Sequence, residues 1–447
     1  METILHRIDS PDCSTQEREH SLKSSMQLLL SRDFGLVWWG QMISQIGDGV
    51  SKLALLWFVY SITGSPLKTT MIGLLQTMPP ILFGPLIGVY LDRLPKKPIM
   101  IAADVLRAVL IGVIPCSVSM DTFTVEFLYV LVFLHAMASA VFGPALTASV
   151  PYLVKRHQFT AANALLQSTT SLGIVVGPAL SGIGIAALSS QEVLCANTVT
   201  YLISAACLVP IRLFQEQLSH TKGNSIVSTA RDLVEGIRFA FFEQRVIPLL
   251  VLIAAFYTFG ASAFATLFPV FVGKLWDLGP VEVGYLWSAL GMGLFLMSIA
   301  LIWLTQWELS KRVYAIATSS AVAGAALCGL IWVSNPVLAF ILMGIIGAGK
   351  GALTPIAWGV MQEITPRFMV GRVLSLYTTG AMVAAIAGMT TFGWITQEFG
   401  ERTSIVGIGL MLFATSLTAV GLSRWVHEHQ VVPDSRTRVG EPHAVDA

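Results

Sequence analysis

Residues 127–154 read FLYVLVFLHAMASAVFGPALTASVPYLV, a stretch without a single Asp, Glu, Lys or Arg. A helix needs roughly 18 or more apolar residues to cross about 30 Å of hydrocarbon, and this stretch is long enough. Uncharged stretches of similar length recur, for example at 157–191, 246–273 and 313–349. Charged residues make up 12% of the chain, whereas soluble proteins average about 25%. The sequence therefore predicts an all-α membrane protein that crosses the bilayer many times.

About twelve transmembrane helices are predicted from such stretches. Their expected ranges are 36–60, 70–91, 98–118, 123–148, 164–188, 192–213, 246–272, 281–304, 313–333, 337–361, 371–396 and 403–425. Lys and Arg concentrate in alternate connections, and the remaining connections hold only Lys68, Lys274 and Arg402. Because basic residues mark cytoplasmic loops, both termini are expected in the cytoplasm.

One long polar segment divides the predicted spans into six and six. The expected parts are a cytoplasmic N-terminal segment (1–34), an N-terminal six-helix bundle (35–213), a linker (214–245), a C-terminal six-helix bundle (246–425) and a disordered cytoplasmic tail (426–447). Within the linker, 228–242 has apolar residues at helical spacing, which predicts an interfacial helix on the cytoplasmic surface. Two tandem bundles are typical of alternating-access transporters.

Composition argues against several other classes of protein. The net charge of +1 gives no sign of nucleic-acid binding, and the five cysteines show no metal-ligand spacing. No nucleophile elbow or phosphate-binding loop is visible, so neither an enzyme nor an ATP-driven pump is expected. We expect no cofactor and no metal, a proton gradient as the energy source, and a monomer whose partners are membrane lipids and a small-molecule substrate.

The connection between the second and third spans reads GVYLDRLPKK over 88–97. It resembles the signature loop of the major facilitator superfamily, Gly-x-x-x-Asp-Arg/Lys-x-Gly-Arg/Lys-Arg/Lys. The matching residues are Gly88, Asp92, Arg93, Lys96 and Lys97, and Pro95 departs from the pattern. The resemblance implies the major facilitator fold, two six-helix bundles around a central cavity, and a conformational gate at this loop. A loop that is basic only because of its cytoplasmic position is the alternative.

The fifth span carries GIVVGPALSG at 173–182. It resembles the Gly-x-x-x-Gly-Pro-x-x-Gly-Gly motif of the exporter branch of that superfamily, with Ser181 at one glycine position. The matching residues are Gly173, Gly177, Pro178 and Gly182. An ordinary face of small residues that pack against a neighbouring helix is the alternative. Further stretches, such as GQMISQIGD at 40–48, resemble the macrolide-efflux and enterobactin-exporter type, which implies drug:proton antiport in a bacterial cytoplasmic membrane.

Polar residues inside the spans are costly, and they therefore mark candidate sites. Gln41, Gln45, Asp48 and Lys52 share one face of the first span. We expect Asp48 to be the principal proton-coupling carboxylate, paired with Lys52 or Lys350, and a static salt bridge is the alternative. Sodium is a second possible coupling ion, because this face offers oxygen ligands.

Other predicted site residues fall into three groups. The proton-coupling group also contains His135, whose alternative role is a neutral hydrogen-bonding histidine. The substrate-cavity group is Gln41, Gln45, Lys350, Tyr257 and Trp358, of which Lys350 could bind an anionic substrate and the aromatic residues could instead be packing residues. The gate group adds Asp104 and Arg107, expected near the signature loop, and Glu363 with Arg372 as the equivalent gate in the second half.

The predicted function is proton-coupled export of small amphiphilic compounds, either drug-like or siderophore-like. The alternatives are a lysophospholipid transporter, a peptide or metabolite transporter, and a membrane receptor on the same scaffold that does not transport.

Overall fold

The computed structural model describes residues 28–120, 123–155, 158–213, 246–304, 308–333, 335–366 and 369–428. The interfacial helix expected at 228–242 lies outside these residues, as do the expected N-terminal segment before residue 28 and the tail after residue 428. Within the described residues the regular structure is helical, and twelve helices are long enough to be compared with the predicted spans.

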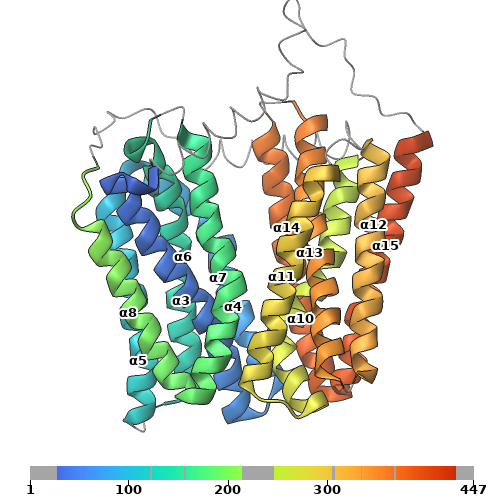
Figure 1. Ribbon diagram of the computed structural model, residues 1–447, viewed down its shortest axis with the longest axis horizontal. Helices are drawn as coiled ribbons and strands as arrows, with labels where there is room; N and C mark the ends of the chain where they lie inside the picture. Colours follow the sequence, from blue (N-terminus) through green and yellow to red (C-terminus); the bar gives the residue numbers. More distant parts are fainter. Residues whose placement is uncertain are drawn as a thin grey trace, which may run out of the picture.

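The first six long helices form the N-terminal bundle (Figure 1). They are α3 (Arg32–Thr63), α4 (Pro66–Arg93), α5 (Lys96–Ser119), α6 (Val125–Leu153), α7 (Phe159–Ala187) and α8 (Ser190–Leu208). The C-terminal bundle consists of α10 (Val246–Trp276), α11 (Pro280–Leu304), α12 (Leu309–Gly329), α13 (Pro336–Ile364), α14 (Val370–Phe399) and α15 (Glu401–Glu428), and a short 3₁₀ helix, η3 (Leu330–Trp332), follows α12. The chain is thus an all-α polytopic membrane protein, as predicted.

Helix starts follow local capping chemistry. Thr124 and Ser189 accept hydrogen bonds from the N–H groups of Phe127 and Glu192, 3.2 Å away in both cases. Asn335 caps α13 in the same way, and Pro336 occupies the first turn, where a missing N–H costs nothing.

The sixth span ends earlier than predicted, at Leu208 instead of 213. Pro210 follows the end of this helix, and a proline has no backbone N–H with which to continue the helical hydrogen bonds.

Nine of the described helices pass a strict test of length and apolarity for crossing a membrane, and α3, α4 and α8 do not. In α3 the polar residues Gln41, Gln45, Asp48 and Lys52 lower the mean hydropathy. Helix α3 therefore crosses the membrane packed against α7 and α8, and its polar face points toward the interior of the bundle.

The two bundles repeat one packing pattern. In the first, α3 packs on α7 and α8, α4 on α6, and α5 on α6 and α8. In the second, α10 packs on α14 and α15, α11 on α13, and α12 on α13 and α15. Each C-terminal helix thus makes the contacts of the helix six positions earlier among the spans. This is the arrangement of a transporter built from structural repeats.

The bundles meet through α7 with α11 and through α4 with α14, with smaller contacts from α10 to α3 and α4. We call the side where α3 begins and α15 ends the terminal side. The ribbons are closest on the opposite side and diverge toward the terminal side (Figure 1). Named contacts agree: Ser65 Oγ donates to Gln397 Oε1 at 2.9 Å, and Ser288 Oγ donates to the Val175 carbonyl at 2.9 Å. These residues lie in the halves of their helices remote from the terminal side.

Candidate functional site

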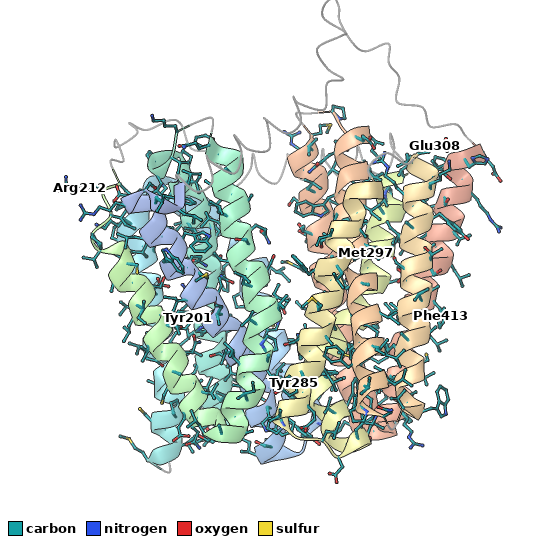
Figure 2. All side chains as sticks on the ribbon, in the orientation of Figure 1. Tyr201, Arg212, Tyr285, Met297, Glu308 and Phe413 are labelled. Atoms are coloured by element: carbon teal, nitrogen blue, oxygen red, sulfur yellow. The ribbon has the colours of Figure 1, made fainter. Side chains whose placement is uncertain are left out.

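A cluster of ionisable side chains is enclosed in the N-terminal bundle. Asp48 of α3 accepts a hydrogen bond from the Tyr201 hydroxyl of α8, and its other oxygen lies 3.8 Å from Arg107 of α5. Arg107 also pairs with Asp104 on its own helix. His135 Nε2 of α6 lies 2.8 Å from the same Tyr201 hydroxyl. Four helices thus contribute to what we call the charge cluster, and Figure 2 places Tyr201 near the middle of the bundle.

Aromatic rings hold the Arg107 guanidinium in place. Its central carbon lies 4.3 Å from the centre of the Phe142 ring and 4.6 Å from the centre of the Tyr201 ring. Such cation–π contacts are strong where water is excluded. Arg107 is 2% exposed and Asp104 is fully buried, whereas the Asp48 side chain is 30% exposed. Asp48 is therefore the carboxylate of this cluster that meets the interior space of the protein.

That space is a polar cavity of about 310 Å³ in the N-terminal bundle. Its polar lining comes from Asp48, Ser51, Lys52, Gln76, His135 and Ser139. Lys52 is exposed to it and makes no ion pair with the described side chains. Asp48 and His135 are thus the members of the charge cluster that border this cavity.

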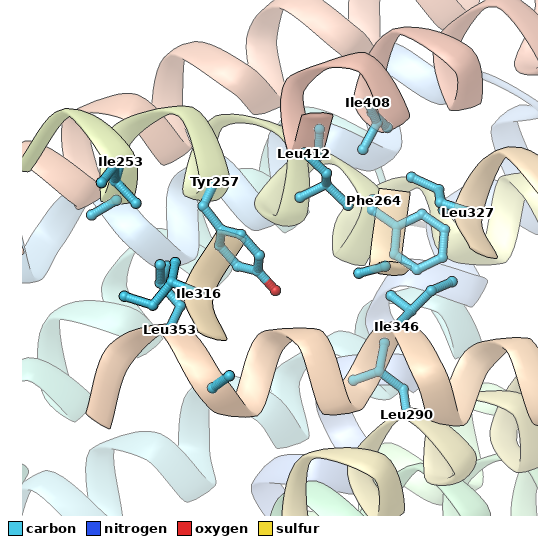
Figure 3. Close-up of a cluster of buried hydrophobic side chains, with 14 of the residues drawn as sticks. Ile253, Tyr257, Phe264, Leu290, Ile316, Leu327, Ile346, Leu353, Ile408 and Leu412 are labelled. Atoms are coloured by element: carbon cyan, nitrogen blue, oxygen red, sulfur yellow. The ribbon is translucent and has the colours of Figure 1, made fainter. Parts of the chain in front are cut away.

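A second, apolar cavity of about 40 Å³ lies in the C-terminal bundle. Tyr257, Phe264, Leu290, Ile346, Ile408 and Leu412 are among the lining residues, and Figure 3 shows them within one cluster of buried apolar side chains. Lys350 of α13 supplies the charge in this lining. The two cavities differ in their lining. The first has several hydrogen-bonding side chains, and the second is lined by apolar side chains with the ammonium group of Lys350.

The prediction that Lys52 or Lys350 pairs with Asp48 is wrong. Among the described side chains, the cation at salt-bridge distance from Asp48 is Arg107. The physical reason is the rotation of α3, which turns Asp48 toward α5 and α8 and leaves Lys52 on the cavity side.

Arg107 and Asp104 were expected in the charge network of the signature loop, and the structure places Arg107 beside Asp48 and Asp104. Because the side chains of Asp92 and Arg93 lie outside the described ones, their part in that network stays a prediction.

Comparison with known proteins identifies the family of the chain. A family model described as "Transmembrane secretion effector" matches residues 23–443. The chain belongs to this family of major facilitator transporters. Macrolide efflux protein A of Streptococcus pyogenes is 24% identical over 397 residues, which is 88% of this chain and 91% of that protein. Multidrug efflux pump Tap of Mycolicibacterium fortuitum is 24% identical over 400 residues, 87% of this chain and 95% of that protein.

Solved structures share the fold. A bacterial homologue of the iron transporter ferroportin, in an inward-facing state, superposes with a TM-score of 0.70 at 13% identity, covering 88% of this chain and 98% of that one. A bacterial homologue of the human lysosomal transporter Spinster, also inward-facing, gives a TM-score of 0.68 at 13% identity, with 89% and 98% covered. The chain is therefore an efflux transporter of the major facilitator type, and its fold and relatives are those of transporters.

In this chain the motif at residues 173–182 makes two different contacts. Gly173 and Gly177 lie against the α3 backbone at Gln45 and Gly49. Gly182 lies against Pro280 and Gly284 of α11, in the other bundle, and a methyl group added there would overlap their backbone. The motif thus joins α3, which carries Asp48, to the interface between the bundles. Its role in export stays a prediction.

The signature-loop lysines bind backbone carbonyls of their own bundle. Lys96 Nζ donates to the carbonyls of Leu91 and Leu94 at 2.6 and 3.1 Å. Lys97 Nζ donates to those of Val209 and Ile211 at 2.7 and 2.8 Å. Both lysines therefore satisfy the carboxyl ends of helices, α4 and α8 respectively. The side chains of Asp92 and Arg93 and the environment of Gly88 lie outside the described ones.

The remaining predicted residues are placed as follows. Glu363 of α13 accepts a hydrogen bond from Arg312 of α12 at 2.6 Å, and the expected gate of Glu363 with Arg372 stays a prediction. Gln41 is buried, with its carbonyl oxygen unpaired among the described atoms. Gln45 and Trp358 line neither of the two cavities.

Tyr201 was missed by sequence reasoning. It lies on the sixth span, which does not line the central cavity in the superfamily fold, and it is one aromatic residue among many in an apolar stretch. Its importance comes from contacts with three other helices, and no spacing within its own helix signals them.

Proposed function

We propose that this efflux transporter exports small amphiphilic compounds in exchange for protons, and that Asp48 is the group that binds the coupling proton. The observation that carries the proposal is the position of Asp48. It belongs to the buried charge cluster and is still 30% exposed to the polar cavity. A coupling group needs both a protein partner that responds to its charge and a path for the proton.

The balance of charges supports this assignment. The charge cluster contains two carboxylates, Asp48 and Asp104, and one guanidinium, Arg107. With both carboxylates ionised the cluster carries a net negative charge inside the membrane, which is costly. One proton removes it. Asp48 receives that proton because Asp104 is fully buried against Arg107, whereas Asp48 borders the cavity.

The hydrogen bonds offer the proton a path. A tyrosine hydroxyl has one proton to donate. When Tyr201 donates to ionised Asp48, its oxygen accepts from His135 Nε2–H. When Asp48 is protonated it can donate to Tyr201, which then donates to His135. Protonation of Asp48 thus reverses the direction of the hydrogen bonds that run from Asp48 on α3 through Tyr201 on α8 to His135 on α6. His135 also borders the polar cavity.

The same event would loosen the attachment of α3. Protonated Asp48 no longer attracts Arg107, so the hold of α3 on α5 weakens. Because α3 packs on α7, and α7 contacts α11 of the other bundle, a change in α3 reaches the bundle interface. A proton can bias the two bundle orientations only by its different affinity for them, and this contact path supplies a physical basis.

We further propose a setting for this cycle. The chain lies in the bacterial cytoplasmic membrane as a monomer, with its termini in the cytoplasm, and uses the proton gradient without a cofactor. The distribution of Lys and Arg supports this orientation. The structure then corresponds to an inward-facing state, in which the closed side faces outward.

The test is substrate-induced proton flux. Everted vesicles with an imposed pH gradient are exposed to a panel of macrolides, dyes, siderophores and lysolipids, with wild type beside Asp48→Asn. We expect at least one compound to dissipate the pH gradient in vesicles with the wild type and not in vesicles with Asp48→Asn. Asp33→Asn is the matched control, because it makes the same change at the start of the same helix and should leave the flux intact. If Asp48→Asn keeps full transport driven by the pH gradient, Asp48 is not the group that binds the coupling proton.

A further inference from the structure

The polar cavity of about 310 Å³ presents two opposite charges from a single helix. Asp48 and Lys52 both line it and lie one turn apart on α3, where Cβ atoms are about 5–6 Å from each other. The two side chains do not pair. Asp48 is held by Tyr201 and Arg107. Lys52 is exposed to the cavity and makes no ion pair with the described side chains. The cavity therefore offers a carboxylate and an ammonium group to the same ligand.

The helices around this cavity leave Lys52 without another counter-charge. The lining comes from α3, α4 and α6, and α7 and α10 also contact α3. Apart from the first and last turns, the Asp, Glu, Lys, Arg and His residues of these five helices are Asp48, Lys52 and His135. Those of α5 and α8 are Asp104 and Arg107, which belong to the charge cluster. Asp48 is the acidic residue of the cavity lining, and other residues already engage it.

These charges determine what a ligand has to carry. With both of its carboxylates ionised, the charge cluster has an excess of one negative charge, and Lys52 carries one positive charge. An ammonium group placed at Asp48 compensates the cluster in the way that a proton does. A carboxylate or phosphate placed at Lys52 compensates the lysine. Because uncompensated charge within a membrane protein is costly, a ligand that carries both groups suits this lining best.

Exchange with protons favours such a ligand over one with a single charge. A ligand that is only a cation leaves the charge of Lys52 uncompensated. A ligand that is only an anion is balanced when Asp48 is protonated, so the anion and the proton would bind together, which is the linkage of a symporter. A zwitterion and a proton instead exclude each other at Asp48, as an exchanger requires.

We propose that the polar cavity binds the head group of the transported substrate, and that this substrate is a zwitterionic amphiphile with its ammonium group at Asp48 and its anionic group at Lys52. Gln76 of α4 and Ser139 of α6 line the same cavity and can hydrogen-bond the head group. Leu55 adds apolar surface to the lining, against which the apolar part of the molecule packs. This inference rests on the proposed export function and specifies its substrate class.

The test compares three fluorescent probes that share a dansyl group on the same five-carbon chain. Nε-dansyl-lysine is a zwitterion, dansylcadaverine lacks its carboxylate, and dansyl-ε-aminocaproate lacks its free amine. Each is titrated into the purified full-length chain in neutral detergent, and the signal of protein-free micelles is subtracted. We expect the wild type to bind the zwitterion about 10-fold more tightly than the cation or the anion, the contribution of one charge-assisted contact.

Two variants should produce a crossed pattern of losses. Lys52→Gln should weaken the zwitterion and the anion by about 10-fold and should not weaken the cation. Asp48→Asn should weaken the zwitterion and the cation by about 10-fold and should not weaken the anion. Because each variant spares one probe, misfolding cannot account for the pattern.

Matched control variants keep the charge or change it elsewhere. Lys52→Arg keeps the positive charge and should retain the preference for the zwitterion. Lys68→Gln changes an exposed lysine at the start of α4, and Asp33→Asn changes an aspartate at the start of α3. Neither should alter the binding of any of the three probes.

The same titrations at mildly acidic pH test the exclusion of the ligand by a proton, because the carboxylates of the probes stay ionised there. Protonation of Asp48 should weaken the zwitterion and the cation and should not weaken the anion. The other charged or titratable groups around Asp48 are Tyr201, Arg107, Asp104, His135 and Lys52. Asp48→Asn should abolish the pH dependence, which assigns it to Asp48 and not to these neighbours.

Several results would overturn the proposal. They are equal affinity of the wild type for the three probes, a preference for the zwitterion that survives Lys52→Gln, and absence of binding of the zwitterion. Failure of the proposed function looks different. Proton flux that depends on Asp48 and accompanies cationic compounds alone rejects the substrate class and keeps the proposed function, whereas flux that survives Asp48→Asn rejects the proposed function itself.

Two sources can supply a zwitterionic amphiphile, and competition distinguishes them. Displacement of Nε-dansyl-lysine by lysophosphatidylethanolamine, and not by α-aminocaprylate, identifies a membrane lipid as the substrate. Displacement by α-aminocaprylate identifies a soluble amphiphile. Displacement by neither compound counts against the substrate class.

Discussion

Replacing Tyr201 by phenylalanine isolates one hydroxyl group of the charge cluster. The ring stays, so its contact with the Arg107 guanidinium is kept. The hydroxyl that donates to Asp48 and contacts His135 is removed. A hydrogen bond to a charged group contributes about 1.5–3 kcal/mol. Its loss disfavours the ionised form of Asp48, so protonation of Asp48 should occur at higher pH.

The size of the shift in pH dependence follows from this hydrogen-bond energy. Since about 1.4 kcal/mol corresponds to one pH unit, the midpoint of the transport profile should move upward by about 1–2 pH units in Tyr201→Phe. The assay is substrate-induced proton flux in proteoliposomes, measured over a series of pH values. Tyr129→Phe is the control, because it removes a hydroxyl that donates to the Lys68 carbonyl at 3.2 Å, in another part of the bundle. A midpoint that stays in place or moves downward in Tyr201→Phe would refute the relay.

Two further predictions concern stability and conformation. Arg107→Gln leaves Asp104 without its cation and should destabilise the protein by about 3–5 kcal/mol, seen as a lower Tm in detergent, and adding Asp104→Asn should recover most of the loss. If the double variant is no more stable than the single one, the pairing argument fails. Gly182→Val overlaps the α11 backbone and should disfavour the present bundle contact by about 1–3 kcal/mol, measured as a shift in inter-bundle distances between spin labels. Gly143→Val, where an added side chain meets open space, should shift nothing, and equal shifts in both variants would contradict the steric explanation.

The fold was predictable because its main determinant is local in sequence. A span long enough to cross hydrocarbon without charge is visible in a single stretch such as 127–154, and the structure has α6 at Val125–Leu153. The two-bundle division follows from one polar interruption. The helices extend a few residues beyond most predicted spans, since a helix continues into the interface after its apolar stretch has ended.

The charge cluster was only partly predictable, for a physical reason. The cost of burying a charge singles out Asp48, Asp104, Arg107 and His135 from the sequence. Which of them touch depends on how each helix is rotated about its axis, and packing decides this. The spacing of Asp48 and Lys52 suggested a pair within one helix. The actual partners of Asp48 come from α5 and α8. The spacing of residues on one helix carries no information about which neighbouring helices they face.

The seal on the side opposite the termini contains no charge among its described contacts. It consists of hydroxyl and amide hydrogen bonds, such as Ser65 with Gln397, and of close backbone approaches, such as Gly182 with Gly284. Every ion pair between described residues joins members of a single bundle. Screening by salt therefore leaves the direct contacts of this seal almost unchanged. A proton can affect the seal only indirectly, for example through Asp48 and the packing of α3 on α7. The opening of the seal has to be driven from elsewhere in the molecule, so a change in ionic strength should leave the rate at which the side opposite the termini opens almost unchanged.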